Sequence, residues 1–103
     1  MAKELYRYQF TRSVSLQDVE ETLFLAVLAT EFLHGQARVR LDAAYCIEDA
    51  KHTCIVDAST DVGLDICRLF TGFAMFEFGE NAFRIERVEG SCKQAAAGRR
   101  PSR

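Results

Sequence analysis

The feature of this sequence that most restricts its fold is its hydrophobic period, which passes twice from alternation to a helical repeat and back. Residues 5–12 alternate apolar and polar side chains, which predicts a half-buried strand. Ser15 begins a sequence similar to a capping box, and a helical repeat then covers residues 16–34. Gly35 stands where a helix commonly ends in a left-handed residue. The first third of the chain therefore predicts a strand followed by a long helix.

The middle of the chain predicts a β-hairpin. Residues 37–47 alternate again, residues 48–51 are polar and turn-like, and residues 52–58 are rich in β-formers. Pairing Ile47 with His52 collects the apolar side chains of both strands on one face, whereas a slip by one residue scatters them. We therefore expect these two strands to pair in that register.

A second helix is expected over residues 61–78, closed by Gly79, and a last strand over residues 83–88. The resulting order is β-α-β-β-α-β. It predicts an α+β protein with the ferredoxin-like arrangement, a four-stranded antiparallel sheet with two helices on one face. This arrangement serves many unrelated activities, so it predicts no function by itself.

Charge divides the chain into a body and a tail. All 15 acidic residues precede Gly90, together with nine of the 13 basic ones, so the body has a formal charge of −6. The other four basic residues lie in the tail, which also holds the only proline. We expect a single domain over residues 1–89 and a flexible basic tail over residues 90–103. An acidic body argues against a nucleic-acid-binding domain, which needs a concentrated basic face.

Both expected helices are apolar on two sides, which is more than one small domain needs to cover its sheet. One stripe of each helix faces the core in our prediction, including Val19 and Leu23 of the first helix and Phe73 and Phe76 of the second. The second stripes face away from the sheet and form a predicted interface of Leu25, Leu28, Phe32, Leu64, Met75 and Phe78. Because soluble monomers rarely expose such a patch, we expect a second copy of the chain or another protein to cover it. A small error in the helix phase, or a tail that folds over the stripe, would also account for it.

The residue types that usually carry chemistry form no recognisable motif. The four cysteines lack the paired spacing of a zinc site, and the predicted register points Cys46 and Cys54 to opposite sheet faces. The sequence contains no P-loop, no G-x-G-x-x-G, no G-x-S-x-G and no H-E-x-x-H. We therefore expect no metal and no cofactor, and the sequence identifies no catalytic residue.

One charged cluster is expected on the open face of the sheet, the face without helices. The predicted register places Asp42 opposite Asp57, with three arginines on the same face, Arg7, Arg40 and Arg84. Opposed carboxylates need a nearby cation, so a lattice of ion pairs explains the cluster. The alternative is an anion pocket, or a carboxylate of raised pKa acting as a general base.

Two functions are consistent with these patterns. The first is an oligomeric interaction or regulatory module that assembles through its helices and has no catalytic activity. The second is a small dimeric enzyme or ligand-binding protein with an anion pocket on the open face of the sheet. No apolar run reaches the roughly 18 to 20 residues that span a bilayer, and the N-terminus does not resemble a signal peptide, so we expect a cytoplasmic protein.

Overall fold

The computed structural model describes residues 3–90, and the basic tail over residues 91–103 lies outside them. The described chain is an α+β fold with a four-stranded antiparallel sheet and three α-helices. In chain order the elements are β1 (Lys3–Phe10), α1 (Leu16–His34), α2 (Gln36–Asp42), β2 (Tyr45–Glu48), β3 (Thr53–Asp57), α3 (Asp61–Phe78), the short 3₁₀ helix η1 (Glu80–Ala82) and β4 (Phe83–Gly90).

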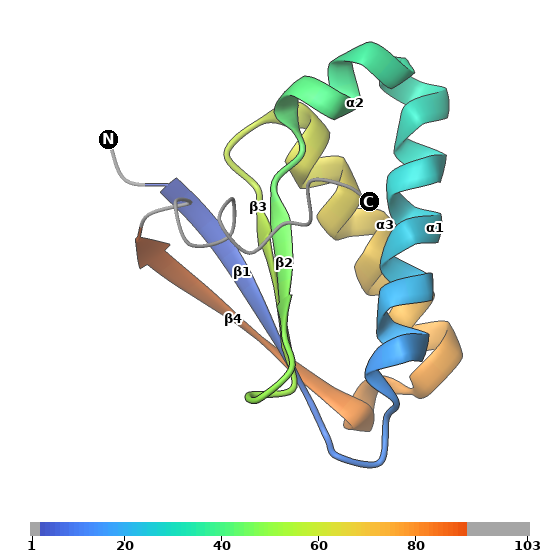
Figure 1. Ribbon diagram of the computed structural model, residues 1–103, viewed down its shortest axis with the longest axis vertical. Helices are drawn as coiled ribbons and strands as arrows, with labels where there is room; N and C mark the ends of the chain where they lie inside the picture. The colour runs from blue at the N-terminus through green and yellow to red at the C-terminus, as the bar shows by residue number, and fades with distance from the viewer. Residues whose placement is uncertain (1–2, 91–103) are drawn as a thin grey trace.

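The sheet has the strand order β2-β3-β1-β4, and every neighbouring pair is antiparallel. β1 is central, pairing with β3 on one side and along its whole length with β4 on the other. Both long helices, α1 and α3, lie side by side over the same face of the sheet (Figure 1). This leaves one helix-covered face and one open face, as the sequence predicts.

The first helix forms where the sequence predicts it. Ser15 caps α1, and its side-chain oxygen accepts a hydrogen bond from the backbone N–H of Gln17. Gly35 ends the helix at a φ of 91°, a conformation that favours glycine. The buried stripe agrees with the prediction at all but two positions, since Thr22 is also buried and Leu16 is only partly buried. The buried residues of α1 are Val19, Thr22, Leu23, Ala26, Val27 and Thr30.

The predicted second strand is wrong in its first half, because residues 36–42 form the helix α2. The alternation of Val39 and Leu41 suggested that both side chains face the core. In a helix two positions apart point in different directions, and Val39 is buried while Leu41 is 84% exposed. Glutamine, alanine, arginine and leucine are also good helix formers. The fold therefore has three helices, not the two that the sequence predicted.

The hairpin register is shifted by two residues from the predicted one. Ile47 pairs with Cys54, not with His52. His52 has a φ of 57°, so it belongs to the turn, and its ring nitrogen Nε2 lies 2.7 Å from the carbonyl oxygen of Val14. Because the shift is an even number, the same side chains of β2 and β3 still face the helices.

Aromatic rings fill the space between the sheet and α3. Phe70 is fully buried, and its ring centroid lies 4.8 Å from that of Tyr8 and 6.3 Å from that of Phe10. The hydroxyl of Tyr8 forms a 2.8 Å hydrogen bond with the hydroxyl of Thr71, so the one polar atom of this ring is paired within the core. These contacts set the rotation of α3 about its own axis.

The start of α3 is packed tightly against the end of β3. Thr60 caps the helix by accepting a hydrogen bond from the backbone N–H of Gly63 at 3.0 Å. A Cβ atom at position 63 would lie 1.9 Å from the backbone oxygen of Asp57. Glycine is therefore required at this position, because any other residue would collide with the strand.

Candidate functional site

The charged residues on the open face of the sheet form a small chain of ion pairs. Arg7 on β1 contacts Glu86 on β4 at 2.6 Å, and Arg84 contacts the same carboxylate at 3.6 Å. The hydrogen bond from Arg7, with the positive charges of both arginines, lowers the pKa of Glu86 below its usual value. The sequence analysis did not single out Glu86, although its position two residues after Arg84 places both on one face.

The structure does not bring the rest of the predicted anion pocket together. Asp42 does not lie opposite Asp57, because it ends α2 and forms an ion pair with Arg38 at 3.5 Å. Arg40 also lies in α2, away from the strands. Asp57 remains on the open face but pairs in register with Leu5. The predicted geometry of two opposed carboxylates among three arginines was therefore wrong, since it depended on a strand where α2 forms.

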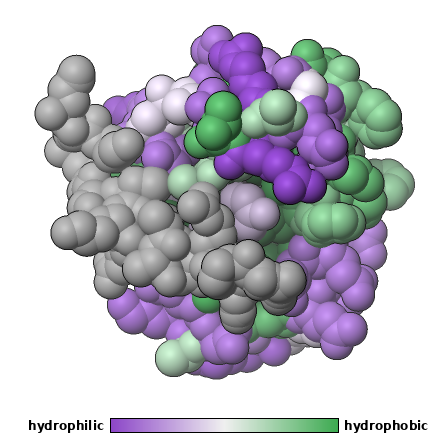
Figure 2. Space-filling model, turned by 45° about the horizontal axis from the view of Figure 1, so that its top comes forward, coloured by the Kyte–Doolittle hydropathy of each residue, from purple (hydrophilic) through white to green (hydrophobic). Residues whose placement is uncertain are grey.

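The outer surface of α1 and α3 is rich in exposed apolar side chains. Phe32 is 86% exposed and Phe76 is 91% exposed, so neither ring is covered by the part of the chain that the structure describes. Large exposed side chains on the two helices are Phe24, Leu25, Leu28, Phe32, Leu33, Met75 and Phe76. Figure 2 shows hydrophobic residues gathered along the right-hand edge of the molecule, the side on which α1 lies in Figure 1.

Part of this surface is concave. A groove of about 400 Å³ runs between the two helices. We call it the apolar groove; its walls are Leu25, Leu28, Ala29 and Phe32 from α1 and Phe73 and Phe76 from α3, with Thr22 and Glu77 as its polar members. Its rim is formed by the two most exposed rings on these helices, so the surface combines a hollow with projecting side chains.

The predicted interface residues fall into two groups. Leu25, Leu28, Phe32 and Met75 are exposed, and the first three line the apolar groove. Leu64 and Phe78 instead pack against the core, where the Phe78 ring lies 5.9 Å from that of Phe10.

The phase assigned to the second helix was wrong at its C-terminal end. Phe76 was expected in the core and is almost fully exposed, whereas Phe70 and Ala74 are buried in its place. Apolar residues occur around the whole circumference of α3, so its wheel alone does not define a buried side.

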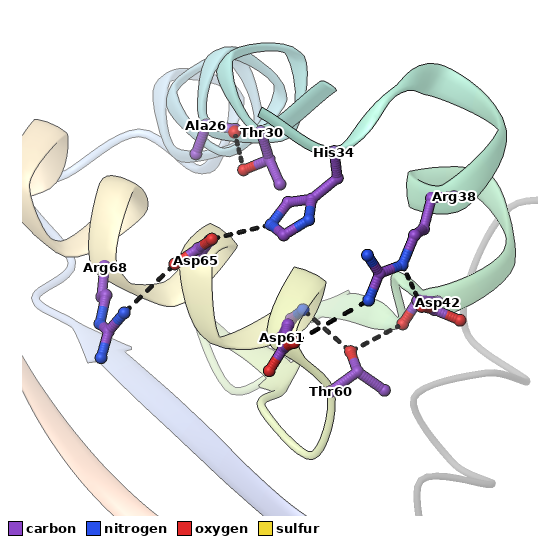
Figure 3. Close-up of polar contacts among 10 residues, drawn as sticks. Ala26, Thr30, His34, Arg38, Asp42, Thr60, Asp61, Asp65 and Arg68 are labelled. Carbon is purple, nitrogen blue, oxygen red and sulfur yellow. Dashed lines mark hydrogen bonds and ion pairs between the residues drawn. The ribbon is translucent and has the colours of Figure 1, made fainter. Parts of the chain in front are cut away.

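A group of polar contacts joins the three helices at the end opposite the chain's β-hairpin (Figure 3). His34, the last residue of α1, contacts Asp65 of α3 at 2.8 Å, and Arg68 contacts the same carboxylate at 3.3 Å. The hydrogen bond with His34 lowers the pKa of Asp65 below its usual value. Nearby, Arg38 of α2 lies 3.9 Å from Asp61. These contacts join α3 to the C-terminal end of α1 and to α2.

The contact between His34 and Asp65 makes a pH dependence testable. Because the folded pKa of Asp65 is lowered, its contribution to stability is present above the unfolded value of about 4 and is lost as the pH falls through the folded value. We expect Asp65→Asn to lower the free energy of unfolding near neutral pH by about 1 kcal/mol or less, since the pair is partly exposed. Urea unfolding at several pH values should show this difference shrinking below about pH 4. A difference that stayed constant through the acid range would contradict the assignment.

The three described cysteines are unsuited to nucleophilic chemistry. Cys46, Cys54 and Cys67 are free and buried. Burial raises the pKa of all three thiols, that of Cys67 to about 12, so little of the reactive thiolate exists near neutral pH.

Within residues 3–90, no group of three or more His, Cys, Asp or Glu side chains is arranged to hold a metal ion. No helix in the same range is long and apolar enough to cross a membrane.

Together, the fold and the surface define a small α+β protein with an apolar groove on its helix layer. The chain matches no known family model, and no curated protein and no solved structure is similar enough to count as a match.

Proposed function

We propose that this protein is a non-catalytic interaction or regulatory module that assembles into a homodimer through the apolar groove and its rim. The observation that carries the proposal is the exposure of Phe32 and Phe76 beside the hollow formed with Leu25 and Leu28. Burial of one such aromatic side chain contributes about 1.5 to 3 kcal/mol. Covering several of them together therefore favours association strongly.

A second copy is the occupant that fits this surface best. A two-fold dimer places the same patch of both protomers in contact, so a patch with both a hollow and projecting rings can fill itself. The residues outside the described range contain no Leu, Ile, Val, Phe, Tyr or Trp. Apart from Met1, they supply no large apolar side chain that could fill the groove.

The proposal includes a ferredoxin-like relationship and a cytoplasmic location. The antiparallel sheet with α1 and α3 on one face supports the first, with α2 as an addition between α1 and β2. Three free, buried cysteines suit a reducing compartment, which supports the second.

The charges around the apolar groove predict how association responds to salt. α1 contains four carboxylates and no Lys or Arg, and α3 contains three carboxylates and one arginine. Two copies that meet through these helices bring like charges together, and salt screens that repulsion. Sedimentation equilibrium should therefore show a dimer whose Kd falls as ionic strength rises from about 0.01 to about 1 M, where the Debye length shrinks from about 30 to about 3 Å.

Two results would overturn this proposal. One is a strict monomer at tens of micromolar at every salt concentration. The other is a dimer that dissociates as salt is added, because that behaviour requires an interface held by opposite charges. A stable complex with another protein at the same surface, with no self-association, would assign the groove to a foreign partner.

A further inference from the structure

The apolar groove has one polar end, formed by Thr22 of α1 and Glu77 of α3. The two helices lie side by side (Figure 1), and His34 at the end of α1 contacts Asp65 near the start of α3, so they run antiparallel. Thr22 and Glu77 each lie 12 residues from that contact, about 18 Å along the helix axes. They therefore lie at the same level, whereas Phe32 lies toward the other end of the groove.

The carboxylate at this end has no partner in the described part of the chain. Of the three carboxylates of α3, Asp61 and Asp65 form ion pairs. Glu77 forms neither an ion pair nor a side-chain hydrogen bond with any residue in the range 3–90. None of the described residues that line the groove is a lysine or an arginine. This end of the groove therefore attracts a positively charged group and repels a negatively charged one.

The rest of the groove suits a hydrocarbon chain. Its volume of about 400 Å³ lies within the range of roughly 300 to 1,000 Å³ that is typical of small-molecule sites. Beyond the polar end its walls are leucine, alanine and phenylalanine side chains from both helices. Thr22 and Phe32 are 10 residues apart, which gives the hollow a length of about 15 Å along α1. An apolar channel with a carboxylate at one end is complementary to an amphiphile with a cationic head.

We propose that the apolar groove binds a single-chain cationic amphiphile of the alkylammonium class, with its head group beside Glu77 and Thr22 and its tail directed toward Phe32. The ammonium group donates charge-assisted hydrogen bonds to the Glu77 carboxylate, and the tail replaces water along the apolar walls. In the proposed dimer the same walls receive the Phe76 ring of the second copy. The ligand therefore competes with the second copy, a consequence that rests on the proposed function.

The test follows the amide resonances of the isotope-labelled full chain during titration with dodecylammonium, below the concentration at which it forms micelles. The expected result is saturable binding with resonance shifts in residues 22–32 and 73–77. Shortening the alkyl chain should weaken binding about fourfold for each methylene removed. Dodecanoate has the same number of carbons and an anionic head, so it should bind at least about fivefold more weakly. Equal affinity for the two ligands would overturn the proposal.

Two matched variants test the position of the head group. Glu77→Gln should weaken dodecylammonium binding about fivefold, the upper end for an exposed ion pair. Glu20→Gln makes the same change at an exposed position of α1 that does not line the groove, and it should leave binding unchanged. Equal effects of the two variants contradict the site. Intermolecular NOEs should join the methylene beside the ammonium to the methyl group of Thr22, and the terminal methyl group to the Phe32 ring. The reverse pattern also contradicts it.

Sedimentation equilibrium with and without dodecylammonium separates the ligand site from the dimer. The expected result is a dimer that dissociates as the groove resonances reach saturation. A dimer that keeps its mass at saturation would overturn the competition. A strict monomer that binds the ligand as described would overturn the dimer and support the ligand site. Absence of saturable binding to either monomer or dimer would overturn the site itself.

Discussion

Gly63→Ala is expected to cost the protein at least about 3 kcal/mol of stability, a large share of the roughly 5 to 15 kcal/mol available to a small domain. The added methyl group would lie 1.9 Å from the backbone oxygen of Asp57, which is far inside van der Waals contact. A flexible side chain could move away from it, but a backbone carbonyl held in β3 cannot. Either α3 must shift from the sheet or β3 must bend.

Gly72→Ala is the matched control for this substitution. It makes the same chemical change in the same helix, but apart from the neighbouring backbone of α3 itself no atom lies within 4 Å of the added carbon. Because alanine is the better helix former, we expect this variant to gain about 0.5 to 1 kcal/mol. Urea unfolding of both variants at one protein concentration measures the difference. Equal stability of the two variants would show that α3 does not pack on β3 as closely as described.

Phe76→Glu is expected to abolish self-association while leaving the protomer folded. The ring is 91% exposed in the single chain, so its loss removes little from the core. In the proposed dimer the same ring is buried, and the glutamate would have to be buried without a partner. A central aromatic anchor is commonly worth about 2 kcal/mol or more, so we expect Kd to rise at least roughly 30-fold.

Leu41→Glu controls for the general effect of replacing an exposed apolar residue by an acid. Leu41 is 84% exposed, but it lies on α2 and does not line the apolar groove. We expect this variant to associate like the parent protein. If both variants dissociated equally, the effect would come from added negative charge and not from loss of the groove contact. Circular dichroism checks that each variant keeps its helices.

The elements whose ends carry strong local signals were predictable from the sequence. Ser15 and Gly35 define α1, and the alternation around Tyr8 defines β1 and its buried face. Residues 36–42 were not predictable in the same way, because two apolar residues separated by one arginine are consistent with a short strand or a single exposed turn of helix. The structure distinguishes them because Val39 is buried while Leu41, two positions along, is exposed.

The candidate site was predictable in kind but not in detail. The excess of apolar residues on α1 and α3 indicated an uncovered surface, and Leu25, Leu28 and Phe32, which were predicted as interface residues, line the apolar groove. Phe76 was missed because the rotation of α3 is set by Phe70 against β1, a contact between residues distant in sequence. The open-face cluster failed because its geometry required a strand at Arg40 and Asp42, where α2 forms.

The most direct measurement of the proposed assembly is an isotope-filtered NOE experiment on a mixture of labelled and unlabelled copies. It detects contacts between protons of different protomers only. The proposed dimer predicts intermolecular NOEs from the Phe76 ring to the methyl groups of Leu25 and Leu28, the residues that form the wall of the apolar groove. A dimer that showed intermolecular NOEs elsewhere, and none from these groups, would contradict the account.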